Sequence, residues 1–253
     1  AENRWRFLLA GDPLVQMGRA KAACAAGDVV LSPEATAIQR AATERVERPE
    51  AVHELADGGT ATPTADATDE TALRAYIADE VLRRVDAGQA AWLAEFRRAS
   101  IVFVVVPTAS FDAPTLRLLR DAVRLGQERV HALGGSLNQV VMDDTGLVLL
   151  AAWGVPDHTH EDDARRAMQA ADDVHAAIGA LGLAVRAGVA TGRVWCGACG
   201  NERRARYAIV GDTVNRAARI ALASPTQARC DDRTREDAAR WLDFESDEPL
   251  RLK

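Results

Sequence analysis

The chain has 253 residues, of which 48% are hydrophobic and 27% charged. This composition suits one or two globular domains and excludes a disordered or collagen-like chain. The net charge of −6 argues against a general nucleic-acid binder, and no apolar run has the roughly 18 residues that a membrane helix needs. Four cysteines do not make a disulfide scaffold, so we expect a cytoplasmic protein.

The chain repeats itself at an offset of 200 residues. Segments 4–23 and 204–223 both combine an apolar strand, a Gly-Asp turn and an Arg-bearing helix. The identical positions are Arg4, Arg6, Gly11, Asp12, Arg19 and Ala23, which recur as Arg204, Arg206, Gly211, Asp212, Arg219 and Ala223. We interpret the repeat as a duplication, in which residues 1–35 are the end of one domain and residues 99–253 are a complete second copy.

Residues 36–98 are predicted to link the two copies. Residues 56–69 are small, polar and turn-forming, which indicates a flexible loop. Residues 70–97 carry apolar side chains at three- and four-residue spacing, which predicts a connecting helix with one apolar face.

The second copy alternates strands and helices. We expect strands at 101–106, 138–142, 147–153, 182–191 and 205–210, and helices at 114–133, 160–181 and 213–222. This order predicts an α+β fold of the ferredoxin-like βαββαβ type, with an antiparallel sheet and helices packed on one face.

Asn215 and Arg219 are the first candidates for chemistry. They lie four residues apart on the predicted helix 213–222 and therefore project from one face. The planar guanidinium fork suits phosphate oxygens, and the amide can bind a sugar oxygen. An arginine on a solvated helix face is the alternative.

The surrounding pattern adds to this reading. Residues 207–219, YAIVGDTVNRAAR, resemble the signature of class III nucleotidyl cyclases, and 101–106, 134–154 and 185–201 resemble successive segments of that family. Residues 75–104 are similar to the connection into the second catalytic domain of soluble, bicarbonate-responsive adenylyl cyclases. The resemblance implies two homologous domains, C1 and C2, that convert ATP to cyclic AMP and pyrophosphate at their interface.

The resemblance also assigns roles. Asn215 would orient the ribose, and Arg219 would stabilise the transferring phosphate. Of the two metal-binding aspartates of C1, the first position falls near Val105 and the second on Asp143, for which a turn role is the alternative. The resemblance therefore implies a C2-type domain that leaves Mg or Mn mainly to a C1 partner, so this chain alone should be inactive.

The positions that would read the base depart from the family pattern. They fall on Gln139 and Ala208, where adenylyl cyclases have a Lys and an Asp or Thr. Recognition of the base would then either rest on backbone groups, such as those of Ile209, or be weak. Ala208 has no hydrogen-bonding side chain, and Gln139 can donate or accept. Two alternatives follow: a degenerate cyclase pair that only senses nucleotides or binds partners, and, more weakly, a guanylyl cyclase.

The N-terminal copy has Val15 where the second has Asn215, and Arg19 where the second has Arg219. In the bicarbonate-responsive group an Arg in this region helps to form the bicarbonate pocket, and Met142 matches a methionine that lines it. A pocket made by Arg19 and Met142, with bicarbonate as an activator, is therefore a further expectation. The Cys196–Cys199 pair is a CxxC that we interpret as structural.

Overall fold

The computed structural model describes residues 8–25, 28–46, 95–108, 110–143, 145–201, 204–224 and 227–245, together with residues 74, 82, 86 and 87. The predicted loop at 56–69 and nearly all of the predicted connecting helix lie outside the described residues. No helix in the described ranges is long and apolar enough to cross a membrane.

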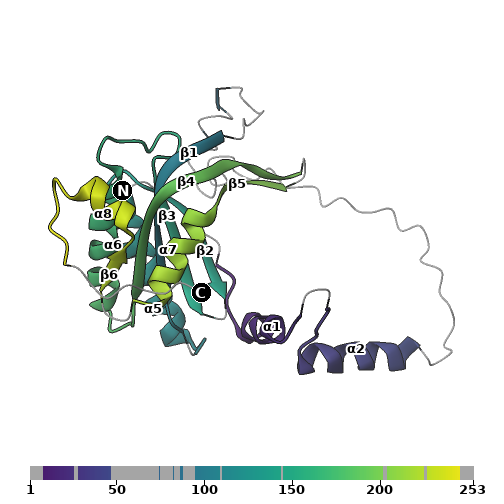
Figure 1. The fold of residues 1–253 in the computed structure, drawn as a ribbon. Coiled ribbons are helices and arrows are strands. Elements are labelled where there is room, and N and C mark those ends of the chain that lie inside the picture. Colours follow the sequence, from purple (N-terminus) through teal and green to yellow (C-terminus); the bar gives the residue numbers. More distant parts are fainter. Residues whose placement is uncertain are drawn as a thin grey trace.

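One curved sheet forms the centre of the molecule (Figure 1). Its strands are β1 (Glu95–Val106), β2 (Ser136–Asp143), β3 (Gly146–Trp153), β4 (Arg186–Asn201), β5 (Arg204–Val210) and the short β6 (Ala228–Cys230). The first five strands are antiparallel in the order β2-β3-β1-β4-β5, and β6 runs parallel to β4. With the helices α5 (Ala113–Ala132) and α6 (Asp163–Gly179), strands β1 to β4 form the predicted βαββαβ unit of an α+β fold.

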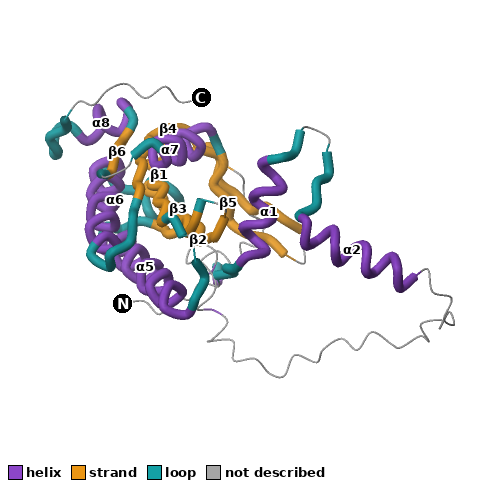
Figure 2. The backbone as a smooth tube through the Cα atoms, turned by 90° about the horizontal axis from the view of Figure 1, so that it is seen from below, coloured by secondary structure: helices purple, strands orange, loops and turns teal. Residues whose placement is uncertain are grey.

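The helices cover both faces of the sheet, which corrects the expectation of a single covered face. Helices α5 and α6 lie on one face, and α7 (Asp212–Leu222) lies on the other (Figure 2). The cause is the unbroken apolar run of β1. Successive residues of a strand point to opposite faces, so Val102 joins the core under α5 and α6 while Ile101 joins the core under α7. Both side chains are almost fully buried.

Two glycines on β4 allow α7 to approach the sheet closely. A Cβ at Gly188 would overlap the backbone of Ala217 and Ala221 in α7. A Cβ at Gly192 would lie 2.6 Å from the hydroxyl of Thr213, at the start of the same helix. The position of α7 therefore depends on these missing side chains.

The N-terminal segment packs against the edge of the sheet. Helix α1 (Asp12–Ala22) contacts β2, and Leu8, Ala10 and Leu14 pack against the core under α5 and α6. Helix α2 (Pro33–Val46) follows it. This helix was not predicted and crosses the expected boundary at residue 35.

Several predicted boundaries are wrong. Strand β1 begins at Glu95, so the end of the predicted connecting helix is strand: Phe96 fits helical spacing but pairs with Trp195 of β4. Strand β4 extends to Asn201, ten residues beyond the predicted end, because all of β5 pairs with residues 195–201 of β4. Strand β6 and helix α8 (Asp232–Ala238) were not predicted, since neither is longer than seven residues.

Candidate active site

Helix α7 divides its side chains between the sheet and the solvent. The buried positions are Thr213, Ala217, Ile220 and Ala221. The exposed positions are Asp212, Asn215, Arg219 and Leu222, which recur every three or four residues and form one stripe. The structure therefore places Asn215 and Arg219 together on the outward face of α7, as the spacing predicts.

The two arginines of α7 differ in their partners. The Nε of Arg216 lies 3.0 Å from the carboxylate of Asp231, whose side chain is only 11% exposed. The Arg219 side chain forms no ion pair or hydrogen bond with any other residue in the described ranges. Arg216 is thus engaged within the domain, while Arg219 presents its guanidinium outward.

The sheet curls so that its two edge strands, β2 and β5, contact each other. The side-chain amide of Asn138 on β2 donates a hydrogen bond of 3.2 Å to the backbone carbonyl of Tyr207 on β5. Gln139 and Ala208 follow these two residues directly, so the positions expected to read a base lie at one junction. Ala208 and Ile209 are 8% and 7% exposed, and Gln139 is half-buried.

Asn138 was missed by the sequence reasoning. It occupies an irregularity of β2, and no pattern of apolar and polar residues indicates that a residue there crosses to β5.

The residues present do not fit a metal site. Val105, at the expected position of the first metal carboxylate, is 1% exposed and pairs with Val148 and Arg186. The carboxylate of Asp143 accepts hydrogen bonds from the backbone NH of Thr145 at 2.8 Å and from its hydroxyl at 2.6 Å, which is a turn-stabilising arrangement. Within the described ranges, no three His, Cys, Asp or Glu residues are placed to hold a metal ion.

The two residues proposed for a bicarbonate pocket lie on elements that touch, α1 and β2. Met142 is 7% exposed and belongs to the core against which Leu14 of α1 packs. The Arg19 side chain is exposed and forms no hydrogen bond or ion pair with another described residue. The pocket remains a prediction.

The CxxC lies within β4. Cys196 is buried and Cys199 is exposed, because residues three apart on a strand point to opposite faces. Burial raises the pKa of the Cys196 thiol. The two sulfurs therefore do not converge on a ligand.

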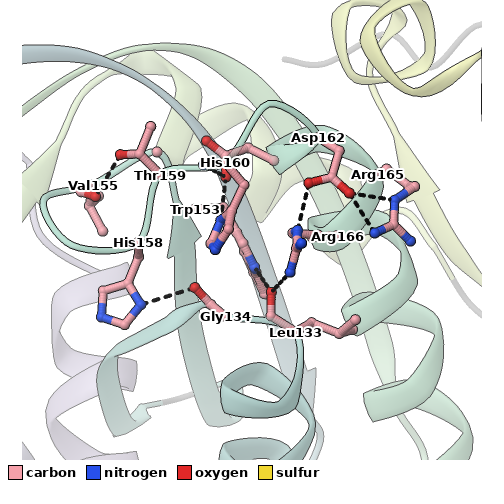
Figure 3. A network of polar contacts seen from close by, with 12 residues as sticks. Leu133, Gly134, Trp153, Val155, His158, Thr159, His160, Asp162, Arg165 and Arg166 are labelled. Carbon is pink, nitrogen blue, oxygen red and sulfur yellow. Dashed lines mark hydrogen bonds and ion pairs between the residues drawn. The ribbon is translucent and has the colours of Figure 1, made fainter.

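The histidines and acidic residues at the start of α6 form a structural network (Figure 3). Nδ1 of His158 lies 3.0 Å from the carbonyl of Gly134, and that of His160 lies 3.1 Å from the carboxylate of Asp163. The Trp153 indole donates to the carbonyl of Leu133 at 2.9 Å. These contacts join the end of α5 to the start of α6.

Asp162 is the charged centre of this network. Burial alone would raise its pKa, but hydrogen bonds from Arg166 and Arg165 lower it to about 2. Arg166 also donates to the Leu133 carbonyl at 3.3 Å. The carboxylate therefore stabilises the connection between α5 and α6.

The pocket beside this network is not at α7. It has a volume of about 300 Å³ and lies on the α6 side of the sheet, where Ser100, Asp163 and Thr191 line it. Asn215 and Arg219 do not contribute to it. A ligand held by the α7 stripe would therefore need a second surface opposite that stripe.

Parts of this chain are similar in sequence to known cyclases. Residues 152–234 match the family "Adenylate and Guanylate cyclase catalytic domain". Adenylate cyclase type 10 of Oryctolagus cuniculus is 29% identical over 167 residues, which are 64% of this chain but 10% of that protein. The chain thus spans only about a tenth of the length of the curated relatives that it matches.

Solved structures agree on the fold. The adenylyl cyclase CyaB from P. aeruginosa superposes with a TM-score of 0.54 at 20% identity, covering 59% of this chain and 84% of that chain. A bacterial light-regulated adenylyl cyclase gives 0.58 at 16% identity, covering 66% and 53%. The chain therefore has the α+β fold of class III nucleotidyl cyclases.

Proposed function

We propose that this domain is the C2-type half of a class III adenylyl cyclase, which converts ATP to cyclic AMP and pyrophosphate at an interface with a C1-type domain. The observation that carries the proposal is the outward stripe of α7. Asn215 and Arg219 lie on it together, and Arg219 has no carboxylate neighbour among the described residues. Such a guanidinium remains available for an anionic ligand.

The two side chains have separate tasks in this proposal. Arg219 donates hydrogen bonds to the phosphoryl oxygens and neutralises the charge that develops on them as the 3′-hydroxyl attacks the α-phosphate. Asn215, one turn earlier on α7, hydrogen-bonds the ribose and keeps the hydroxyl in line. Both residues act by position and charge, and neither forms a covalent bond with the substrate.

A partner domain must supply the rest of the site. Because Val105 and Asp143 do not fit a metal site, Mg or Mn would be bound mainly by carboxylates of the C1-type domain. Residues 1–35 are interpreted as the end of such a domain. We expect this chain alone to be inactive and the intact protein to act in the cytoplasm.

Recognition of the base is assigned to residues on β2 and β5. The backbone of Ile209 and the amide of Gln139 are proposed to contact the adenine, and Ala208 leaves room for it without a hydrogen bond. Arg19 and Met142 are retained as a proposed pocket for bicarbonate, which would act as an activator.

The test is cyclic nucleotide formation by the intact protein. ATP and GTP are offered separately with Mn, with and without bicarbonate, to the unaltered protein and to Arg219→Ala. We expect cyclic AMP from ATP, and a loss of roughly a hundredfold or more in the variant. Arg124→Ala is the matched control, because the partner of Arg124 within the described ranges is Glu128, at 2.8 Å on the surface of α5.

One alternative has specific support. Ala208 has no side chain to bind a base, which favours a degenerate cyclase pair that senses nucleotides or binds partners without turnover. Nucleotide binding without cyclic product in the intact protein would select this alternative. Cyclic GMP as the main product would instead select a guanylyl cyclase.

A further inference from the structure

Asn138 is an extra residue in β2. Leu137 pairs with Ala151 of β3, and Gln139 pairs with Leu150, the very next partner. Asn138 therefore has no partner on β3, which is the arrangement of a β-bulge. Bulges change the direction of a side chain, and here the half-buried amide reaches β5 across 69 residues of sequence.

The bond to β5 fixes the orientation of the amide. The Tyr207 carbonyl can only accept a hydrogen bond, so the nitrogen of the Asn138 amide must face it, at 3.2 Å. The carbonyl oxygen Oδ1 then points away from this partner. It accepts no hydrogen bond from another residue within the described ranges, so a fixed acceptor is left at the junction of β2 and β5.

We infer that Asn138 is the residue that distinguishes adenine from guanine, with Oδ1 accepting a hydrogen bond from the 6-amino group of adenine. This inference rests on the proposed function. Guanine carries a 6-oxo group, which would place two acceptors face to face and leave both unsatisfied. Asn138 is thus a specificity-determining residue that stands beside the positions first expected to read the base.

Its neighbours cannot discriminate in the same way. Ala208 has no polar side chain, and the Gln139 amide is not held by a hydrogen bond from another described residue. A free amide can rotate to present either its donor or its acceptor, so it suits both bases. Of the described residues at this junction, it is the amide of Asn138 that a hydrogen bond holds in one orientation.

The hydrogen bond from Asn138 to Tyr207 also fixes the position of β5. It holds the middle of β5 against β2, and β5 leads through Gly211 into α7. Loss of the donor alone would loosen β5 and weaken the binding of any nucleotide. Loss of the acceptor would change the choice of base.

Two variants of nearly equal size separate these effects. Asn138→Leu removes both the donor and the acceptor, whereas Asn138→Asp keeps an acceptor and removes the donor. In the intact protein, the affinities for fluorescent ATP and GTP analogues and the kcat/KM for ATP and GTP are measured for each. We expect the ATP-to-GTP preference to fall about tenfold in Asn138→Leu, and to stay within about threefold in Asn138→Asp while both affinities fall.

Gln169→Leu is the matched control, since it removes a half-buried amide that, among the described residues, bonds to Asp173 on the same helix α6. Thermal melting of each variant shows that it is folded. An unchanged preference in a folded Asn138→Leu protein overturns the inference and leaves the proposed function standing. An unaltered protein that binds neither nucleotide overturns both.

Discussion

Gly11 and Gly211 have nearly the same backbone conformation, although 200 residues separate them. Their φ and ψ angles are 142° and 170° for Gly11, and 157° and 169° for Gly211. Each precedes a helix of 11 residues and accepts a hydrogen bond of 3.1 Å from the NH three residues later. The repeated Gly-Asp pair is therefore one structural device used twice, a turn that aims the first residues of a helix.

Gly211→Ala should destabilise the domain. A positive φ with an extended ψ is accessible to glycine and costs other residues about 1–3 kcal/mol. The new Cβ would also lie 3.3 Å from the carbonyl oxygen of Arg193. We expect the free energy of unfolding to fall by this amount in urea denaturation.

Gly179→Ala is the control for that substitution. Gly179 is the last residue of α6, and a Cβ there has nothing within 4 Å. Because alanine favours the helix, the variant should be as stable as the unaltered protein or up to about 1 kcal/mol more stable. Equal effects of the two substitutions would show that the conformation of Gly211 is not needed.

A second prediction concerns the close packing of α7 on β4. Gly188→Ala should cost about 3 kcal/mol, because the new methyl group meets the backbone of Ala217 and Ala221, which cannot rotate away. Gly192→Ala meets the hydroxyl of Thr213, a side chain that can move, and should cost about 1 kcal/mol. Urea denaturation of both variants gives the comparison, and the reverse order would contradict the close packing of α7 on β4.

Much of the fold was predictable from local patterns. The apolar run of β1, the amphipathic α5 and the turn at Asp143 each mark an element that the structure confirms. The cover of both sheet faces was also implied by that run, since a strand that is apolar on both sides must be buried on both. The length of β4 was not predictable, because pairing with β5, rather than its own composition, keeps it extended.

The site was predictable only in part. Asn215 and Arg219 share a face because helical geometry alone decides it. The junction of Asn138 with Tyr207 depends on the curl of the sheet and on a bulge, and these are long-range features. Arg216 and Arg219 differ because Arg216 forms an ion pair with Asp231. Asp231 follows β6, a strand that was not predicted from the sequence.

A third prediction concerns acid stability. The pKa of Asp162 is lowered from 3.8 to about 2 in the folded protein. Its contribution to stability is therefore complete above pH 3.8 and is lost as the pH falls through about 2. Asp162→Asn should lower the free energy of unfolding by about 1 kcal/mol at pH 6, a figure reduced for screening by solvent.

The difference between Asp162→Asn and the unaltered protein should shrink as the pH falls from 4 to 2. Unfolding by urea at several pH values measures it. Asp172→Asn, an exposed position on the same helix, is the control and should show no such dependence. A difference that persists below pH 2 would mean that the amide loses packing rather than charge.

The last prediction tests the origin of α1. Met17 is 62% exposed, whereas its counterpart in the repeat, Ala217, is fully buried against the sheet. If α1 is the end of a C1-type domain, the sheet of that domain should cover Met17 in the intact protein. Methionine oxidation by hydrogen peroxide, read by mass spectrometry, reports this exposure.

We expect Met17 to oxidise readily in residues 1–253 alone and several-fold more slowly in the intact protein. Met142 is the internal control, since it is 7% exposed and should react slowly in both. Equal oxidation of Met17 in the two samples would contradict a covering sheet and, with it, the interpretation of residues 1–35. Protection of Met17 together with cyclic AMP formation would place α1 and α7 in equivalent positions on the two halves of one catalytic pair.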